Sequence, residues 1–284
     1  MRTREDSVAR VLVRKVGNGG GKREPDTLVV EEPMEIRLGY GPAEDRRALS
    51  LSITMRTPGD DFELAAGFLL TEGIVTGKGQ ITAVERCGPA APGRETGNIV
   101  RVEVTPDVPV DPARLQRNFY ATSSCGICGK ASLDAVEIRG LREMDRSAPV
   151  VRKEMIHDLP SRMREGQMLF HQTGGIHGAG LFQADGTLLE VREDVGRHNA
   201  VDKLVGGRLL AGSFPLHDTI MTVSGRAGFE IVQKAVAAEI PVVVSVGAPS
   251  TLSVSLAERF GMTLIGFVRD NRYNIYTCEE RIHG

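Results

Sequence analysis

The sequence predicts a protein of the α/β class, in which a small α+β domain at residues 1–112 precedes a three-layer α/β domain at residues 151–284. In the first part, runs rich in β-branched residues surround a single helical pattern, which indicates strands with one helix packed on them. In the second part, continuous apolar runs alternate with helical patterns, as buried parallel strands do. Residues 113–150 form a polar connection, which we expect to be a mobile loop.

The first part is expected to contain strands at 10–16, 26–38, 48–57, 80–87 and 98–104. A helix is predicted over residues 60–73. Asp60 is its expected N-cap, Glu63 follows three residues later, and Gly73 follows its end. The glycine-rich stretch 17–23 has the wrong spacing for a phosphate-binding loop, and Arg23 stands where that loop needs Ser or Thr. A hairpin loop is therefore the preferred interpretation.

The second part is expected to begin with a helix at 161–172 and an antiparallel pair, 176–182 with 187–193, around the turn 183–186. A helix at 196–212 follows. After it, strands at 219–225, 241–247 and 262–268 alternate with helices at 227–239 and 251–261. This order predicts a parallel sheet with helices on both faces.

Polar clusters follow each of the three predicted parallel strands, where ligands of open α/β sheets bind. The clusters are Ser224, Gly225 and Arg226; Pro249, Ser250 and Thr251; and Arg269, Asp270, Asn271 and Arg272. Helix N-termini and arginines both suit phosphate. Each cluster alone is better explained as a helix cap with solvated arginines, but three at neighbouring strand ends favour a site for a phosphorylated ligand.

Two histidines lie in further polar stretches. His198 belongs to a charged cluster, residues 192–203, that either caps a helix or lines a site for a charged ligand. His177 follows Gly174 and Gly175, which allow close backbone approach, and it either points at a ligand or packs against a neighbour. The sequence leaves both alternatives open.

Composition narrows the class of protein. A net charge of −2 gives no sign of a general nucleic-acid or membrane-surface binder. Four cysteines in 284 residues are too few for a disulfide scaffold, and neither a signal peptide nor an apolar run of membrane-spanning length is apparent. We expect a cytoplasmic protein.

Cys125 and Cys128 form a C-x-x-C motif inside the polar connection. A structural zinc site has weak support because Cys87 and Cys278 are single and distant, and the H-x-E and P-C-x-x-C signature of zinc deaminases is absent. A redox dithiol is possible, but the motif lies outside a thioredoxin-like βαβ unit. A thiol that accepts a sulfur atom and passes it on also fits. The spacing alone does not separate these two chemistries.

A set of ordered motifs closely resembles the FdhD family of formate dehydrogenase accessory sulfurtransferases. The motifs are "PDTLVVEEP", "DDFELAAGFLLTEGIV", "SSCGICGKASLD", "TGGIHGAGLF", "REDVGRHNAVDKL", "SGRAGFEIVQKA", "APSTLSVSLAE" and "GFVRDNRYNIYT". They extend from about Pro25 to Thr277, nearly the whole chain. The resemblance implies a cytidine-deaminase-like fold without the zinc for the second domain.

The resemblance also implies a function and its residues. Sulfur would pass from a cysteine desulfurase to the bis-guanine-dinucleotide molybdenum cofactor, which formate dehydrogenase requires; GDP would mimic part of that cofactor. Cys125 would carry the persulfide, with Cys128 as a supporting thiol, and a homodimer is expected. The family's cofactor-binding segment matches Phe267, Val268, Arg269, Asp270, Asn271 and Arg272. To these we add Ser224, Arg226, Ser250, His177 and His198 from the strand-end and histidine patterns.

Overall fold

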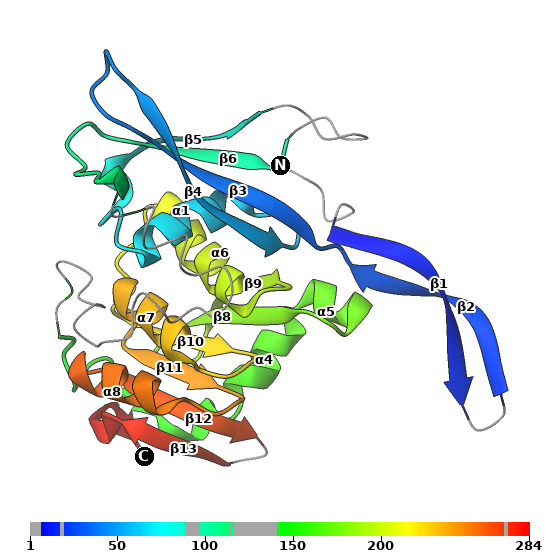
Figure 1. Ribbon diagram of the computed structural model, residues 1–284. Coiled ribbons are helices and arrows are strands. Elements are labelled where there is room, and N and C mark those ends of the chain that lie inside the picture. Colours follow the sequence, from blue (N-terminus) through cyan, green and yellow to red (C-terminus); the bar gives the residue numbers. More distant parts are fainter. Residues whose placement is uncertain are drawn as a thin grey trace.

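The computed structural model describes residues 7–17, 20–88, 97–113, 115, 141, 143–269 and 272–284. Figure 1 shows a four-stranded sheet and a six-stranded sheet with helices α1 and α6 between them, and a long hairpin that projects from the body. The first half contains β1 (Val8–Gly17), β2 (Gly20–Val29), β3 (Glu32–Tyr40), β4 (Arg47–Arg56), α1 (Asp61–Thr71), β5 (Ile81–Cys87) and β6 (Ile99–Val104).

The second half begins with short elements and continues with the sheet. It contains β7 (Val151–Arg152), α3 (Lys153–Ile156), α4 (Leu159–Glu165), α5 (Met168–Thr173), β8 (His177–Gln183), β9 (Leu188–Asp194), α6 (Arg197–Leu210), β10 (Thr219–Val223), α7 (Phe229–Ala237), β11 (Val242–Ser245), α8 (Thr251–Arg259), β12 (Thr263–Arg269), β13 (Arg272–Thr277) and β14 (Ile282–His283).

The predicted strand 26–38 is wrong as one strand, because it divides at residues 30 and 31. β2 pairs only with β1, forming a two-stranded antiparallel hairpin whose strands meet at Gly17 and Gly20. β3 belongs instead to the four-stranded sheet, between β4 and β6. The apolar pattern continues through residues 30 and 31 because the segments before and after them, β2 and β3, are both strands. The predicted hairpin is present, but Gly17 and residues 20–23 of the glycine-rich stretch belong to its strands and not to a loop.

Helix α1 is confirmed with Asp60 at its N-cap position, but Asp60 does not cap the helix through its side chain. Asp60 occupies the cap position with a left-handed backbone (φ 52°), and its side chain makes no capping hydrogen bond. The neighbouring Asp61 is buried and pairs instead with Arg56, whose Nε donates to Asp61 Oδ1 at 2.9 Å. Gly73 follows the helix in a left-handed conformation (φ 71°), as its position predicted.

The six-stranded sheet has the order β13-β12-β11-β10-β8-β9, and β10, β11 and β12 are parallel to one another. Every residue of β10 and β11 is buried, which confirms the predicted parallel strands. β8 and β9 are antiparallel, as the turn at 183–186 predicted.

The single helix predicted at 161–172 is two short helices, α4 and α5. They are separate because the carboxylate of Glu193, on β9, accepts hydrogen bonds from the backbone N–H groups of Leu169 (2.8 Å) and Phe170 (2.9 Å). Those N–H groups belong to the first turn of α5 and would point back into α4 if one helix continued. A long-range contact therefore starts a new helix.

Apolar side chains pack on both faces of this sheet. On one face, residues of α6, α7 and α8 form a cluster that continues through α1 to the four-stranded sheet. On the other face, residues of α3 and α4 pack against Phe182, Ile220 and Val244. Helices thus cover both faces of the six-stranded sheet, as three layers require. The cytidine-deaminase-like relationship and the domain limits at residues 112 and 150 stay predictions.

Two glycines bring α1 and α6 into backbone contact. A Cβ atom at Gly206 would lie 2.6 Å from the backbone nitrogen of Gly67 and would overlap the carbonyl oxygen of Glu63. A Cβ at Gly67 would in turn overlap the carbonyl oxygen of Asp202. Because neither glycine has a side chain, the helix of the first part lies directly on the helix of the second part.

Candidate functional site

The polar clusters after β10, β11 and β12 lie at one edge of the sheet, because these three parallel strands are neighbours. β8 is antiparallel to β10, so its first residue, His177, lies at the same edge. A Cβ atom at Gly225 would lie 3.5 Å from His177 Nδ1. We call this edge, formed by residues 177–178, 224–226, 247–250 and 267–272, the rim. Two predicted binding residues of this edge, Asp270 and Asn271, lie outside the described residues.

Backbone hydrogen bonds connect the loops of the rim in sequence. Ser224 N donates to Gly178 O (3.0 Å), and Gly247 N donates to Gly225 O (3.1 Å). Phe267 N then donates to Gly247 O (3.1 Å). A Cβ at Gly247 would lie 3.0 Å from Arg226 Cα, so glycine is needed for this close approach. The rim is therefore held by main-chain contacts.

Three predicted arginines, Arg226, Arg269 and Arg272, are exposed on the rim. Within the described part of the chain, none of them makes a recorded hydrogen bond or ion pair. Arg269 and Arg272 are also direct partners across the β12–β13 hairpin. Like charges opposite each other in a sheet repel, and an anion between them would remove that repulsion. This arrangement suits a phosphate group.

Phe267 has the backbone conformation that most departs from its residue type. Its φ is 57°, in a bulge of the β12–β13 pair between Gly266 and Arg269, and its side chain is 40% exposed. A bulky residue with positive φ is a genuine outlier, and such outliers concentrate at ligand sites. The bulge turns the aromatic ring outward at the rim, where it can stack on a flat ligand group.

Two other predicted binding residues have structural roles. The side chain of Val268 is buried in the core against α3 and α4, so only its backbone can face a ligand. Ser250 forms a capping box at α8: its Oγ accepts a hydrogen bond from Ser253 N (3.2 Å), and its N donates to Ser253 Oγ (2.8 Å). The Oγ of Ser224 accepts a hydrogen bond from Gly178 N (3.0 Å) and holds β8 against β10.

The two predicted histidines, His177 and His198, are close enough to interact electrostatically. Burial, with the positive charges of Arg197 and His198, lowers the pKa of His177, so His177 is neutral at pH 7. His198 Nε2 lies 2.9 Å from Glu230 Oε2. This hydrogen bond lowers the pKa of Glu230. The sequence analysis included Arg197 in the cluster at 192–203 but missed Glu230, whose pairing with His198 has no local signature in the sequence.

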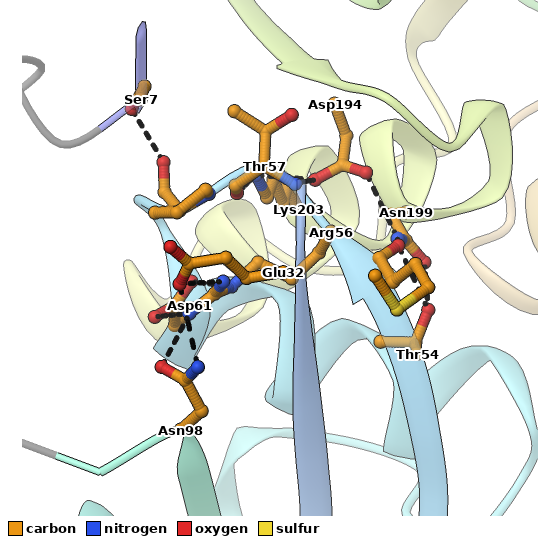
Figure 2. Close-up of polar contacts among 12 residues, drawn as sticks. Ser7, Glu32, Thr54, Arg56, Thr57, Asp61, Asn98, Asp194, Asn199 and Lys203 are labelled. Atoms are coloured by element: carbon orange, nitrogen blue, oxygen red, sulfur yellow. Dashed lines mark hydrogen bonds and ion pairs between the residues drawn. The ribbon is translucent and has the colours of Figure 1, made fainter. Parts of the chain in front are cut away.

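The charged cluster at residues 192–203 was expected either to cap a helix or to line a ligand site. Most of its side chains stabilise the fold, so the structural alternative holds for all members except those that face the rim. Figure 2 shows Asp194 surrounded by polar partners. Its Oδ2 accepts from Thr57 N (3.0 Å) and lies 2.7 Å from Lys203 Nζ, and its Oδ1 accepts from Asn199 Nδ2 (3.0 Å). Asp194 and Lys203 are almost completely buried. This network joins the end of β4 to α6.

Cys125 and Cys128 lie outside the described residues. In the described part, Cys87 and Cys278 are both free thiols. Burial, followed by the charge of Glu258, raises the pKa of the Cys278 thiol, which makes it a poor nucleophile at neutral pH. Over the same residues, no cluster of three His, Cys, Asp or Glu side chains could hold a metal ion, and no helix is long and apolar enough to cross a membrane.

The residues that follow the C-x-x-C segment are attached at the edge of the sheet opposite the rim. Met144 N donates to Phe260 O (3.0 Å), and Arg146 pairs with Glu258 at 2.7 Å. Phe260 and Glu258 end α8, immediately before the amino end of β12. The rim lies at the carboxyl end of that strand. The C-terminal end of the segment that carries the C-x-x-C motif is thus fixed one strand length away from the rim.

The chain belongs to the FdhD/NarQ family, whose model it matches over residues 29–283. This bears out the resemblance carried by the ordered motifs. The family match begins at the end of β2, so nearly all of the β1–β2 hairpin precedes it.

Individual relatives are similar along almost their whole length. The sulfur carrier protein FdhD of Streptomyces avermitilis is 50% identical over 275 residues, which cover 96% of this chain and 95% of that protein. The sulfur carrier protein FdhD of Thermoplasma volcanium is 42% identical, with coverage of 95% and 94%. A crystal structure from Desulfotalea psychrophila, of a protein provisionally assigned as a formate dehydrogenase accessory protein, superimposes with a TM-score of 0.72 at 25% identity, covering 97% of this chain and 99% of that one.

Proposed function

We propose that this protein is a sulfurtransferase that carries sulfur as a persulfide on Cys125 and delivers it to the bis-guanine-dinucleotide molybdenum cofactor required by formate dehydrogenase. The observation that carries the proposal is a full-length similarity to proteins named sulfur carriers, in a chain that retains both cysteines of the C-x-x-C motif. The cofactor is the substrate of this reaction and not a resident group. The donor would be a cysteine desulfurase, and the protein would act in the cytoplasm as a homodimer.

The first chemical step needs only the two proteins. The Cys125 thiolate attacks the outer sulfur of the desulfurase persulfide, and the sulfur–sulfur bond of that persulfide breaks. The desulfurase cysteine leaves as a thiolate, and Cys125 gains the outer sulfur. No net oxidation occurs, so no other oxidant or reductant is required. Cys128, three residues away, is the supporting thiol.

Several features of the rim support binding of a guanine dinucleotide substrate. Arg226, Arg269 and Arg272 are exposed cations without recorded protein partners, and they can bind the phosphates by paired hydrogen bonds. Phe267 presents an aromatic face for stacking on a purine. The neutral His177 can donate or accept a hydrogen bond there without adding charge. These residues support binding at the rim.

Chain length allows Cys125 to approach the rim. Cys125 lies 18 residues before Glu143, next to the residues fixed opposite the rim, and an extended chain of that length spans up to about 60 Å. The seven residues of β12, which separate the two edges of the sheet, span about 23 Å. The cysteine can therefore collect sulfur at one edge and deliver it at the other, even though residues 143–146 are fixed opposite the rim.

Sulfur transfer to Cys125 can be measured directly. The protein is incubated with a cysteine desulfurase and cysteine, and its intact mass is recorded. We expect the unaltered protein and the Cys87→Ser control to gain one sulfur and Cys125→Ser to gain none. The competing function is a dithiol oxidoreductase. If the protein reduces insulin disulfides and takes up no sulfur, that function replaces the one proposed.

Binding at the rim is tested separately with GDP. Loss of one charged hydrogen bond costs about 1.5–3 kcal/mol, so calorimetry should show roughly ten- to a hundred-fold weaker binding for Arg272→Ala. The control is Arg47→Ala, which removes an exposed arginine on β4. Equal affinities for all three proteins would exclude Arg272 from the site, and no binding by the unaltered protein would refute the rim as the site.

A further inference from the structure

The β1–β2 hairpin, residues 8–17 and 20–29, is a projecting arm with an unusual charge. It carries five basic side chains and two acidic ones, a net charge of +3, on a chain whose total is −2. The arm contains Arg10, Arg14, Lys15, Lys22, Arg23, Glu24 and Asp26. Figure 1 shows it extending away from the body. The arm is thus a local cationic element on a mildly acidic protein.

One face of the arm combines arginine with exposed apolar side chains. The strand register places Arg14 opposite Arg23 and Leu12 opposite Pro25, and residues two apart on each strand share that face. Leu12 is 67% and Val16 is 76% exposed. Arg10, Arg14 and Arg23 have no recorded ion pair within the described residues, whereas Lys15 on the other face pairs with Glu24 at 3.1 Å. This face has no acidic residue.

A two-stranded hairpin is only marginally stable by itself, and both outer edges of this one lack a strand partner in the described chain. An exposed face of arginine and aliphatic side chains is suited to a partner that supplies carboxylates at its rim and apolar contact at its centre. A polyanionic nucleic acid fits less well, because the remainder of the chain is net acidic. A membrane surface also fits less well, because the arm has no Trp, Tyr or Phe.

The position of the arm indicates which partner it meets. β2 contacts α5, and α5 ends four residues before His177, so the base of the arm borders the rim. The C-terminal attachment of the cysteine segment, at Met144, lies at the opposite edge of the sheet. The arm therefore stands beside the site from which a cofactor would leave, and not beside that attachment.

We propose that the arm is a docking element for an acidic surface of the enzyme that receives the cofactor, formate dehydrogenase. This inference rests on the proposed function for the identity of the recipient. Nearly all of the arm precedes the part of the chain that the family model matches, which begins at residue 29. Its arginines would accelerate encounter with the recipient, and Leu12 and Val16 would be buried in the complex.

The test uses formate dehydrogenase from the same organism, purified without its molybdenum cofactor and immobilised for interferometry. We compare the unaltered chain with Arg14→Glu/Arg23→Glu and with a matched control, Lys78→Glu/Arg152→Glu, which reverses two exposed charges elsewhere. At low ionic strength the arm variant should associate at least about tenfold more slowly than the control, and the difference should shrink in high salt.

Equal association rates for the arm variant and the control, or no binding by the unaltered chain, would overturn the docking role. So would arm-dependent binding to duplex DNA or phosphatidylserine vesicles in place of the enzyme. Sulfur uptake by Cys125, measured on the same preparations, keeps the two proposals apart. If uptake fails while arm-dependent docking persists, the persulfide function is refuted and the docking surface stands.

Discussion

Adjacent glycines on α6, Gly206 and Gly207, should respond in opposite ways to replacement by alanine. In Gly206→Ala the new Cβ would overlap the carbonyl oxygen of Glu63 on α1 and lie 2.6 Å from a second backbone atom. The clash is with backbone, which cannot rotate away. The helices must separate by roughly 1 Å, and overpacking of this kind costs about 1–3 kcal/mol. The better helix propensity of alanine recovers only about 0.5–1 kcal/mol.

Gly207→Ala is the matched control, because it makes the same chemical change one residue away. Its Cβ would meet the ends of two side chains, Glu190 Oε1 at 3.2 Å and Arg192 Nη2 at 3.4 Å, and these can move. The gain in helix propensity should then dominate and stabilise the protein by up to about 1 kcal/mol.

Thermal unfolding followed by circular dichroism measures both variants. Each kcal/mol corresponds to about 2–4 °C in a protein of this size, so Gly206→Ala should lower the Tm by several degrees and Gly207→Ala should leave it unchanged or raise it. The reasoning fails if Gly206→Ala is as stable as Gly207→Ala, since the backbone contact between α1 and α6 would then not constrain the fold.

Three further changes have defined outcomes. Asp194→Ala leaves Lys203 buried without its counter-charge and should destabilise the protein by about 3–5 kcal/mol in urea denaturation; a loss below about 1 kcal/mol would contradict this network. Ser250→Ala removes the capping box of α8 and should cost about 1 kcal/mol in the same assay, whereas an unchanged midpoint would show that the cap contributes nothing. Burial tends to raise the pKa of Asp61, but neighbouring arginines hold that pKa below its ordinary value, so the carboxylate stabilises the fold above pH ~4 and loses this effect as pH falls. Arg86 is one of these arginines and lies 2.7 Å from Asp61 Oδ2. Arg86→Met should therefore raise the pH at which the protein unfolds in acid, and an unshifted acid transition would count against the pairing of Arg86 with Asp61.

The sequence predicted the sheet and the location of the rim, because both depend on local patterns. Buried parallel strands have continuous apolar runs, and the rule that ligands bind beyond their carboxyl ends needs only the order of elements. That reasoning placed Arg226 and Arg269 at one edge of the sheet. The family resemblance, which matched the whole segment 267–272, also included Val268, although the side chain of Val268 points into the core.

Contacts between distant parts of the chain were beyond the reach of sequence patterns. Asp60 has the residue type and spacing of an N-cap, but the chain enters α1 in a left-handed conformation, while Asp61 is bound by arginines from two strands. The break between α4 and α5 similarly depends on Glu193, which lies more than twenty residues later. The pairing of Glu230 with His198 joins two helices and has no local signature.

The backbone hydrogen bonds between the loops of the rim separate its shape from its chemistry. Gly178, Gly225, Gly247 and Phe267 are joined through main-chain atoms, which every amino acid possesses. Side chains that project from this frame can be exchanged during evolution while the loops keep their positions. Family members that differ at half of their residues can thus have different charged or aromatic side chains at the rim, as long as the glycines that permit close approach remain.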